Sequence, residues 1–191
     1  METFTPPRPF VPHPDFERDR RRSLHDLKQE IDKNAIDLPL LPLMQECMNV
    51  THCFTLQCCY GHFVHAREPD RENLVPLSRY TREVGRIEYR IAYVAFCIED
   101  APEGHELYSE LEKIAGLDPA FVQFGSADWF WDQMPDTYCL QLEPERMRDA
   151  DSGDVTREAA IRIDELRGPF FERLLKIMYR HRKQAPNLTA G

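Results

Sequence analysis

The chain has 191 residues, a length typical of one domain and sufficient to bury a core without disulfides. Its formal net charge of -9 argues against a general nucleic-acid-binding protein, because a negative surface repels phosphates. No stretch approaches the roughly 18 consecutive apolar residues that a membrane-spanning helix requires. We therefore expect a cytoplasmic protein that does not enter a membrane.

The cysteine pattern also favours a reducing compartment. The six cysteines form neither a Cys-x-x-Cys pair nor a disulfide framework, and they lie at positions 47, 53, 58, 59, 97 and 139. A zinc knuckle or a disulfide scaffold is therefore not predicted, and the cysteines are expected to be reduced thiols.

The two ends of the chain differ in composition from its middle. Residues 1–14 contain five of the fifteen prolines, and proline removes backbone donors and favours an extended chain. This segment is predicted to be an arm outside the core, and residues 185–191 a frayed tail. Residues 15–184 are predicted to form a single domain.

Four segments have the apolar spacing of helices. They are Asp15–Lys33, a short helix within Leu38–Val50, Glu103–Ala115 and Val155–Lys183. The dipeptide Gly168-Pro169 is predicted to kink or split the last of these helices.

Two regions before the middle of the chain read as strands. His52–Cys59 and Phe63–Ala66 are predicted to be joined by a tight connection at Gly61, because glycine accepts a left-handed backbone. The polar segment 67–85 is predicted to be a loop. Arg86–Ile98 alternates apolar and charged residues at its start and then becomes apolar on both faces, which indicates one long strand entering the core.

Two further segments, Phe121–Trp131 and Thr137–Glu143, are predicted to form a β-hairpin around a loop at 132–136. Helices thus come first and last, with the strands grouped between them. This order predicts an α+β fold with a largely antiparallel sheet flanked by helices, and it disfavours a doubly wound parallel sheet.

The first candidate site is the segment Cys58-Cys59-Tyr60-Gly61-His62. A thiol and an imidazole beside a glycine turn could act as acid, base, nucleophile or metal ligand, and Cys59 and His62 are the candidate catalytic residues. His65 follows three residues later, but an extended backbone would direct the two rings to opposite faces, which argues against a two-histidine metal site. The alternative is a buried strand whose cysteines serve as small apolar residues.

The same region resembles the wybutosine-synthesis tRNA methyltransferases, the family that methylates 4-demethylwyosine in phenylalanine tRNA. That family has a basic helix, an aspartate, an apolar helix ending in Ile-Asn, a strand containing threonine and the motif Ser-Cys-Ser-Gly-Arg. The matching residues here are Phe16, Leu24, Asp37, the run Leu38–Met48, Asn49, Thr55, Cys59 and Gly61. Tyr60 and His62 stand where the family has the second serine and the arginine.

The resemblance covers about a quarter of the chain. It implies a mixed α+β fold and a pocket for S-adenosylmethionine, with Thr55 and Gly61 among the cofactor-binding residues. It does not carry over the substrate, and tRNA as a partner is disfavoured by the net charge of -9.

The second candidate site is the segment Phe124–Trp131. In an extended chain Gly125, Ala127, Trp129 and Trp131 would share one face, and the two small residues would leave room for a flat ligand stacked on tryptophan. Gly125, Trp129 and Trp131 are therefore candidate cofactor-binding residues. The alternative is close packing of a helix over Gly125 and Ala127, with the tryptophans in the core or at a contact between subunits.

Three functions are compatible with the sequence. The leading one is a small-ligand-binding enzyme distantly related to tRNA-modifying methyltransferases and dependent on S-adenosylmethionine. The second is a non-enzymatic cytosolic domain that senses a ligand or binds a protein. The third is a thiol or metal-binding protein built on Cys58, Cys59 and His62. No dinucleotide fingerprint, phosphate-binding loop or nucleophile elbow occurs in the sequence.

Overall fold

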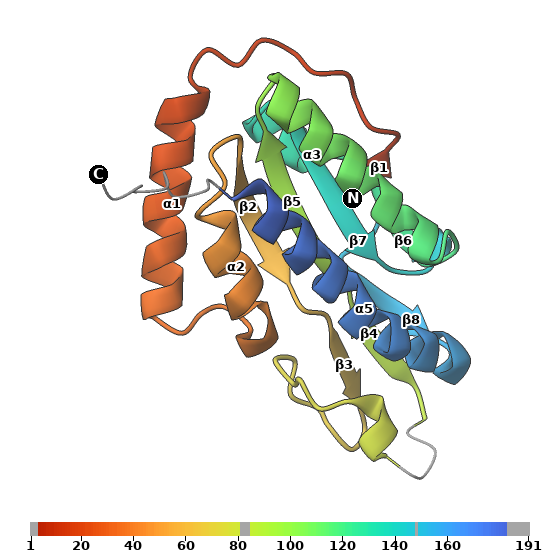
Figure 1. Cartoon of the computed structure of the whole chain (residues 1–191). Helices are drawn as coiled ribbons and strands as arrows, with labels where there is room; N and C mark the ends of the chain where they lie inside the picture. Colours follow the sequence, from red (N-terminus) through yellow and green to blue (C-terminus); the bar gives the residue numbers. More distant parts are fainter. Residues whose placement is uncertain (1–3, 81–84, 148, 183–191) are drawn as a thin grey trace.

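The computed structural model describes residues 4–80, 85–147 and 149–182. It contains two antiparallel sheets and the helices that pack on them, which confirms the predicted α+β class. In Figure 1, helices α2, α3 and α5 lie across one face of the larger sheet, and α1 lies beside its edge strand β2. No helix within the described ranges is both long and apolar enough to cross a membrane.

The larger sheet has the strand order β1-β6-β7-β5-β2. Its strands are β1 (Phe4–Thr5), β6 (Val122–Ala127), β7 (Thr137–Leu142), β5 (Ala92–Ile98) and β2 (Cys53–Cys59). The smaller sheet has the order β3-β4-β8, with strands β3 (His62–His65), β4 (Ile87–Arg90) and β8 (Ser152–Val155).

The helices are α1 (Phe16–Asp32), α2 (Leu41–Cys47), α3 (Pro102–Glu112), α4 (Asp128–Gln133) and α5 (Arg157–His181). Short 3-10 turns occur at η1 (Leu38–Leu40), η2 (Leu77–Arg79), η3 (Lys113–Leu117) and η4 (Glu145–Met147). Helix α5 is continuous through Gly168-Pro169, so the prediction that the helix splits at this dipeptide is wrong.

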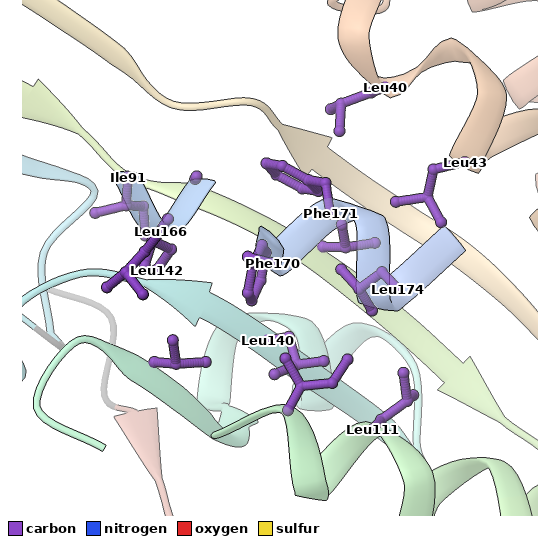
Figure 2. Packing of buried hydrophobic residues seen from close by; sticks show 14 of the residues in the cluster. Leu40, Leu43, Ile91, Leu111, Leu140, Leu142, Leu166, Phe170, Phe171 and Leu174 are labelled. Carbon is purple, nitrogen blue, oxygen red and sulfur yellow. The ribbon is translucent and has the colours of Figure 1, made fainter. Parts of the chain in front are cut away.

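The main core forms where α5 crosses the larger sheet. Phe170 and Leu174 of α5 are fully buried and belong to one cluster with Leu43 of α2, Leu111 of α3 and Leu140 of β7. Figure 2 shows these side chains around the ribbon of α5, where they come from α2, α3, α5 and the sheet. Burial of this many apolar side chains supplies the main stabilising free energy, at about 1.5–3 kcal/mol for each large side chain.

The two sheets meet at a joint where two strand pairs are interrupted at the same level. β2 is followed by β3 after Gly61, and β4 is followed by β5 after Ile91. The side chain of Tyr89 bridges the joint. Its hydroxyl donates a hydrogen bond to the carbonyl oxygen of Leu142 and accepts one from the backbone amide of Ala92, both at 2.8 Å. The long strand predicted over residues 86–98 is therefore wrong in one respect, because it is divided between two sheets.

Two further expectations need correction. The predicted strand Phe121–Trp131 ends at Ala127, and Asp128 begins helix α4, where Phe130 turns inward and is buried. The segment 1–14, predicted to lie outside the core, contributes β1 and the buried side chain of Phe4 to the fold. Both corrections have one cause: packing against distant residues outweighs local propensity. The tail at 185–191 lies outside the described residues.

Candidate functional site

A cluster of three chemically different side chains lies at the joint between the sheets. Asp37, Cys59 and His62 each offer one ligand atom, and these atoms all lie within 4.8 Å of one another. They come from three segments: the residue before η1, the end of β2 and the start of β3. Cys59 and His62, the predicted catalytic residues, are thus brought together, and Asp37 joins them.

Backbone groups hold two members of this cluster in place. The amide of Tyr60 donates to Asp37 Oδ2 at 2.8 Å, and Asp37 Oδ2 lies 3.3 Å from His62 Nε2. The other imidazole nitrogen, Nδ1, lies 3.2 Å from the carbonyl oxygen of Asn73, which can only accept, so Nδ1 carries a proton. The imidazole therefore has a fixed orientation with Nε2 toward the cluster.

The protonation of the pair follows from these contacts. Burial alone would lower the pKa of His62, but its hydrogen bonds to Asp37 and Cys59 outweigh burial and raise the pKa to about 10. Burial likewise opposes ionisation of Asp37, yet the bonds from His62 and the Tyr60 amide leave its pKa lowered. The two side chains therefore form an ion pair at neutral pH.

The arrangement differs from a Cys-His-Asp catalytic triad. In a triad the carboxylate binds one imidazole nitrogen and the nucleophile binds the other. Here the carboxylate of Asp37 faces Nε2 of His62, and Nδ1 is taken by a backbone carbonyl. Carboxylate, thiol and imidazole converge on one point instead of forming a relay.

Gly61 makes the joint possible through its backbone. Its φ of 86° lies in the left-handed region, and an added Cβ would stand 2.8 Å from Ala92 Cβ and 2.9 Å from the Tyr89 hydroxyl. Its carbonyl oxygen accepts a 2.7 Å hydrogen bond from Nη1 of the buried Arg167 in α5. The space over the Cα atom of Gly61 is therefore filled by Ala92 and Tyr89, and no room for a ligand is left there.

Arg167 is a site-supporting residue that sequence reasoning missed. Its guanidinium also binds Asp164 at 2.7 Å and lies over the Tyr60 ring, 4.5 Å from the ring centre. A signal was present in the sequence: position 167 falls among the apolar positions 163, 166, 170 and 174 of the helix, where a charged residue requires a buried partner.

A pocket of about 690 Å³ opens on the face of the larger sheet that α3 and α5 do not cover. Leu140 and Leu142 of β7 point into the core beneath these helices, so Gln141 between them points to the other face. Gln57 and Tyr93 lie on the same face and are hydrogen bonded, with the Tyr93 hydroxyl donating at 2.8 Å. The pocket is lined by Gln57, Arg90, Ile91, Tyr93, Asp128, Trp129, Phe130, Asp132, Gln141 and Asp151.

One row of cross-strand pairs connects this pocket with the cluster. Cys59 of β2 pairs with Tyr93 of β5, Tyr93 pairs with Gln141 of β7, and Gln141 pairs with Gln123 of β6. Paired residues point to the same face of a sheet. Cys59 therefore lies at the β2 end of the row whose middle forms the pocket wall.

The second predicted site is only partly assembled. Trp129 lines the pocket and is 49% exposed, whereas Trp131 packs edge-on against Tyr138, outside the pocket lining. The space over Gly125 is filled by the chain itself, because an added Cβ would clash with the Thr5 carbonyl oxygen. The shared strand face expected for Gly125, Trp129 and Trp131 does not exist, since helix α4 begins at residue 128.

Thr55 lies away from both features. Its side chain is buried near a β-bulge in β2, and its carbonyl oxygen accepts a 2.6 Å hydrogen bond from Ser23 of α1. Cys58 pairs with Val94 on the core side of the sheet, and burial raises its thiol pKa to about 12. Neither residue reaches the cluster or the pocket lining.

No protein-family model and no curated protein matches the chain. Two solved structures of the PH1069 protein from Pyrococcus horikoshii are distantly similar. One has a TM-score of 0.46 and 11% identity, covering 87% of this chain and 92% of PH1069. The other has a TM-score of 0.45 and 13% identity, covering 88% of this chain and 92% of PH1069. Similarity at this distance carries no information about function.

Proposed function

We propose that this protein is a small-ligand-binding enzyme, and that the pocket on the open face of the larger sheet takes S-adenosylmethionine. The observation that carries the proposal is the state of Gln141. Its side chain is 4% exposed, and among the described residues its Oε1 atom has no hydrogen-bond partner. A buried polar atom without a partner costs about 1–3 kcal/mol, and rotation of this amide toward a ligand donor in the pocket would remove this cost.

The size and walls of the pocket suit a ligand with an aromatic ring. Its volume of about 690 Å³ falls within the range of about 300–1,000 Å³ for sites that take small molecules. The half-exposed indole of Trp129 supplies a flat apolar surface on which a purine can stack. Gln141 lines the same pocket and can bond the polar edge of such a ring.

The charges around the pocket suit a cation that also carries a carboxylate. Asp128, Asp132 and Asp151 line it, and Arg90 is the cation among the lining residues. The sulfonium and ammonium groups of S-adenosylmethionine are complementary to the aspartates, and its carboxylate is complementary to Arg90. The methyltransferase resemblance of residues 16–62 supports the same ligand.

Titration calorimetry with S-adenosylmethionine tests this proposal. We expect saturable binding by the wild type and at least tenfold weaker binding by Gln141→Leu, a change of about 1.4 kcal/mol. Gln123→Leu is the matched control, because Gln123 pairs with Gln141 on the neighbouring strand but lies outside the pocket lining. Absence of heat at millimolar ligand, or equal affinity in all three proteins, would contradict the proposal.

A non-enzymatic ligand sensor is the second candidate, favoured by the exposure of the Trp129 ring, which also suits a contact with another protein. An enzyme and a sensor can be distinguished by what each releases after binding the ligand. With S-adenosylmethionine bound, an enzyme supplied with its acceptor releases S-adenosylhomocysteine, whereas a sensor returns the ligand unchanged.

A further inference from the structure

We propose that Asp37, Cys59 and His62 form a binding site for a zinc-type divalent transition metal ion. This site is separate from the pocket and does not depend on the pocket ligand. The proposal stands on the type of the donors, their spacing, their charge and the contacts that orient them.

The donor set is the first argument. A carboxylate oxygen, a thiol sulfur and an imidazole nitrogen converge within 4.8 Å. Zinc accepts all three donor types, whereas calcium and magnesium prefer oxygen alone. Binding of the ion displaces two protons to solvent, one from the Cys59 thiol and one from Nε2 of His62. The Asp37 carboxylate and the Cys59 thiolate then carry two negative charges, which the divalent ion neutralises.

The spacing is the second argument. Ligands at about 2.0–2.3 Å from a tetrahedral zinc ion stand about 3.3–3.8 Å from one another. His62 Nε2 and Asp37 Oδ2 are 3.3 Å apart, and the wider limit of 4.8 Å holds for the whole cluster. The three side chains therefore need to move only slightly to surround an ion.

The outer contacts are the third argument. Histidine ligands usually donate their second ring N–H to a backbone carbonyl or carboxylate, which fixes the tautomer and the ring orientation. His62 Nδ1 makes this contact with the Asn73 carbonyl oxygen at 3.2 Å, leaving Nε2 toward the cluster. The Tyr60 amide orients Asp37 in the same way.

Access and exclusion of water are the fourth argument. Cys59 and His62 are almost fully buried, at 3% and 1% exposed, while the side chain of Asp37 is 18% exposed. An ion can thus enter past Asp37 and is then shielded from bulk water. Three protein ligands leave one position for a water or substrate atom, which is the pattern of catalytic rather than structural zinc sites.

The test uses full-length protein without a histidine tag, stripped with a chelator and titrated with Co²⁺ in the absence of any organic ligand. We expect one Co²⁺ per chain, a sulfur-to-cobalt charge-transfer band in the near ultraviolet, and displacement of the ion by Zn²⁺. Cys59→Ser should lose the band, and Asp37→Asn and His62→Gln should each bind at least tenfold more weakly.

Cys58→Ser is the matched control, because it removes the neighbouring thiol on the opposite face of the strand and should keep the band. Circular dichroism establishes that each variant is folded. X-ray absorption at the zinc edge of the zinc-loaded wild type is a second measurement that needs no variant. We expect the zinc ion to have one sulfur neighbour and otherwise nitrogen and oxygen neighbours.

Three results would overturn the metal site. They are stoichiometric binding without the sulfur band, an unchanged band in Cys59→Ser, and a zinc edge without a sulfur neighbour. None of these bears on S-adenosylmethionine, whose binding is measured separately, so failure of one proposal does not count against the other.

Discussion

Cys59 pairs with Tyr93 across strands β2 and β5, and this pair places the Asp37–Cys59–His62 cluster beside the wall of the pocket. The thiol lies at the edge of the sheet, and the tyrosine lines the pocket. The two candidate sites predicted from the sequence, one around residue 60 and one around residue 129, are therefore neighbours on one face of one sheet.

Replacing Gly61 with alanine should destabilise the protein strongly. The residue has positive φ, and the new methyl group would stand 2.8 Å from Ala92 Cβ and 2.9 Å from the Tyr89 hydroxyl. Backbone strain and overpacking together should cost about 2–4 kcal/mol, measured by urea denaturation. Gly168→Ala is the control: nothing lies within 4 Å of its new Cβ, and alanine inside a helix should stabilise by about 0.5–1 kcal/mol. Equal effects at the two glycines would show that the joint is not tightly packed.

Arg167→Met should lower the free energy of unfolding by about 2–4 kcal/mol, because it leaves the Gly61 carbonyl without its donor and Asp164 without its cation. Methionine retains most of the apolar stem, so the loss reports on the guanidinium. Arg173→Met changes an exposed arginine of the same helix and should stay within about 0.5 kcal/mol of the wild type. If the denaturant midpoint fell by the same amount in both variants, the buried guanidinium of Arg167 would not be specifically stabilising.

Gly125 should be coupled energetically to the N-terminal strand. In the full chain, Gly125→Ala would press against the Thr5 carbonyl oxygen and the Phe4 ring and should cost about 1–3 kcal/mol. In a chain that lacks residues 2–5 the same substitution should cost little, because the strand that it displaces is gone. Thermal or urea unfolding of the four proteins gives the coupling free energy. Simple additivity would mean that β1 does not pair with β6 in solution.

His52 should make the protein less stable in mild acid. Its Nε2 lies 3.0 Å from Nδ1 of His181, and burial, followed by the charges of His181 and Arg20, lowers its pKa from 6.5 to about 4 despite Glu103. Between these two pH values the unfolded chain binds a proton at His52 that the folded chain does not. Stability should therefore fall as pH drops from about 6.5 toward 4.

The measurement is the melting temperature at pH 7 and at pH 5. His52→Gln should lose less stability on acidification than the wild type, because the group that titrates only in the unfolded chain is absent. His25→Gln, which changes an exposed histidine, should follow the wild type. A His52→Gln curve parallel to that of the wild type would show that His52 is not the acid-sensitive group.

Much of the fold could be predicted because it follows from local periodicity. The spacing of Leu24, Leu27 and Ile31 predicted a helix over 15–33, and the structure has one over Phe16–Asp32. The division of residues 86–98 at Ile91 could not be predicted in this way, because Tyr89 and Gly61 create it from different parts of the chain.

The site shows the same division. Cys59 and His62 were identified from residue type and from their position beside a glycine turn. Asn73 and Gln141 were not, because a loop carbonyl and a buried polar side chain acquire meaning only through tertiary contacts. The aromatic run Trp129–Trp131 is predicted to be a strand because aromatic residues favour sheets, yet its packing forms helix α4.

The most direct test of the pocket uses the fluorescence of Trp129. The chain has two tryptophans, so Trp131→Phe leaves Trp129, which lines the pocket, as the single reporter. S-adenosylmethionine added to this variant should change the emission saturably, with a midpoint that matches the calorimetric dissociation constant. Binding that registers by calorimetry but leaves the Trp129 emission unchanged would place the ligand elsewhere and contradict the account.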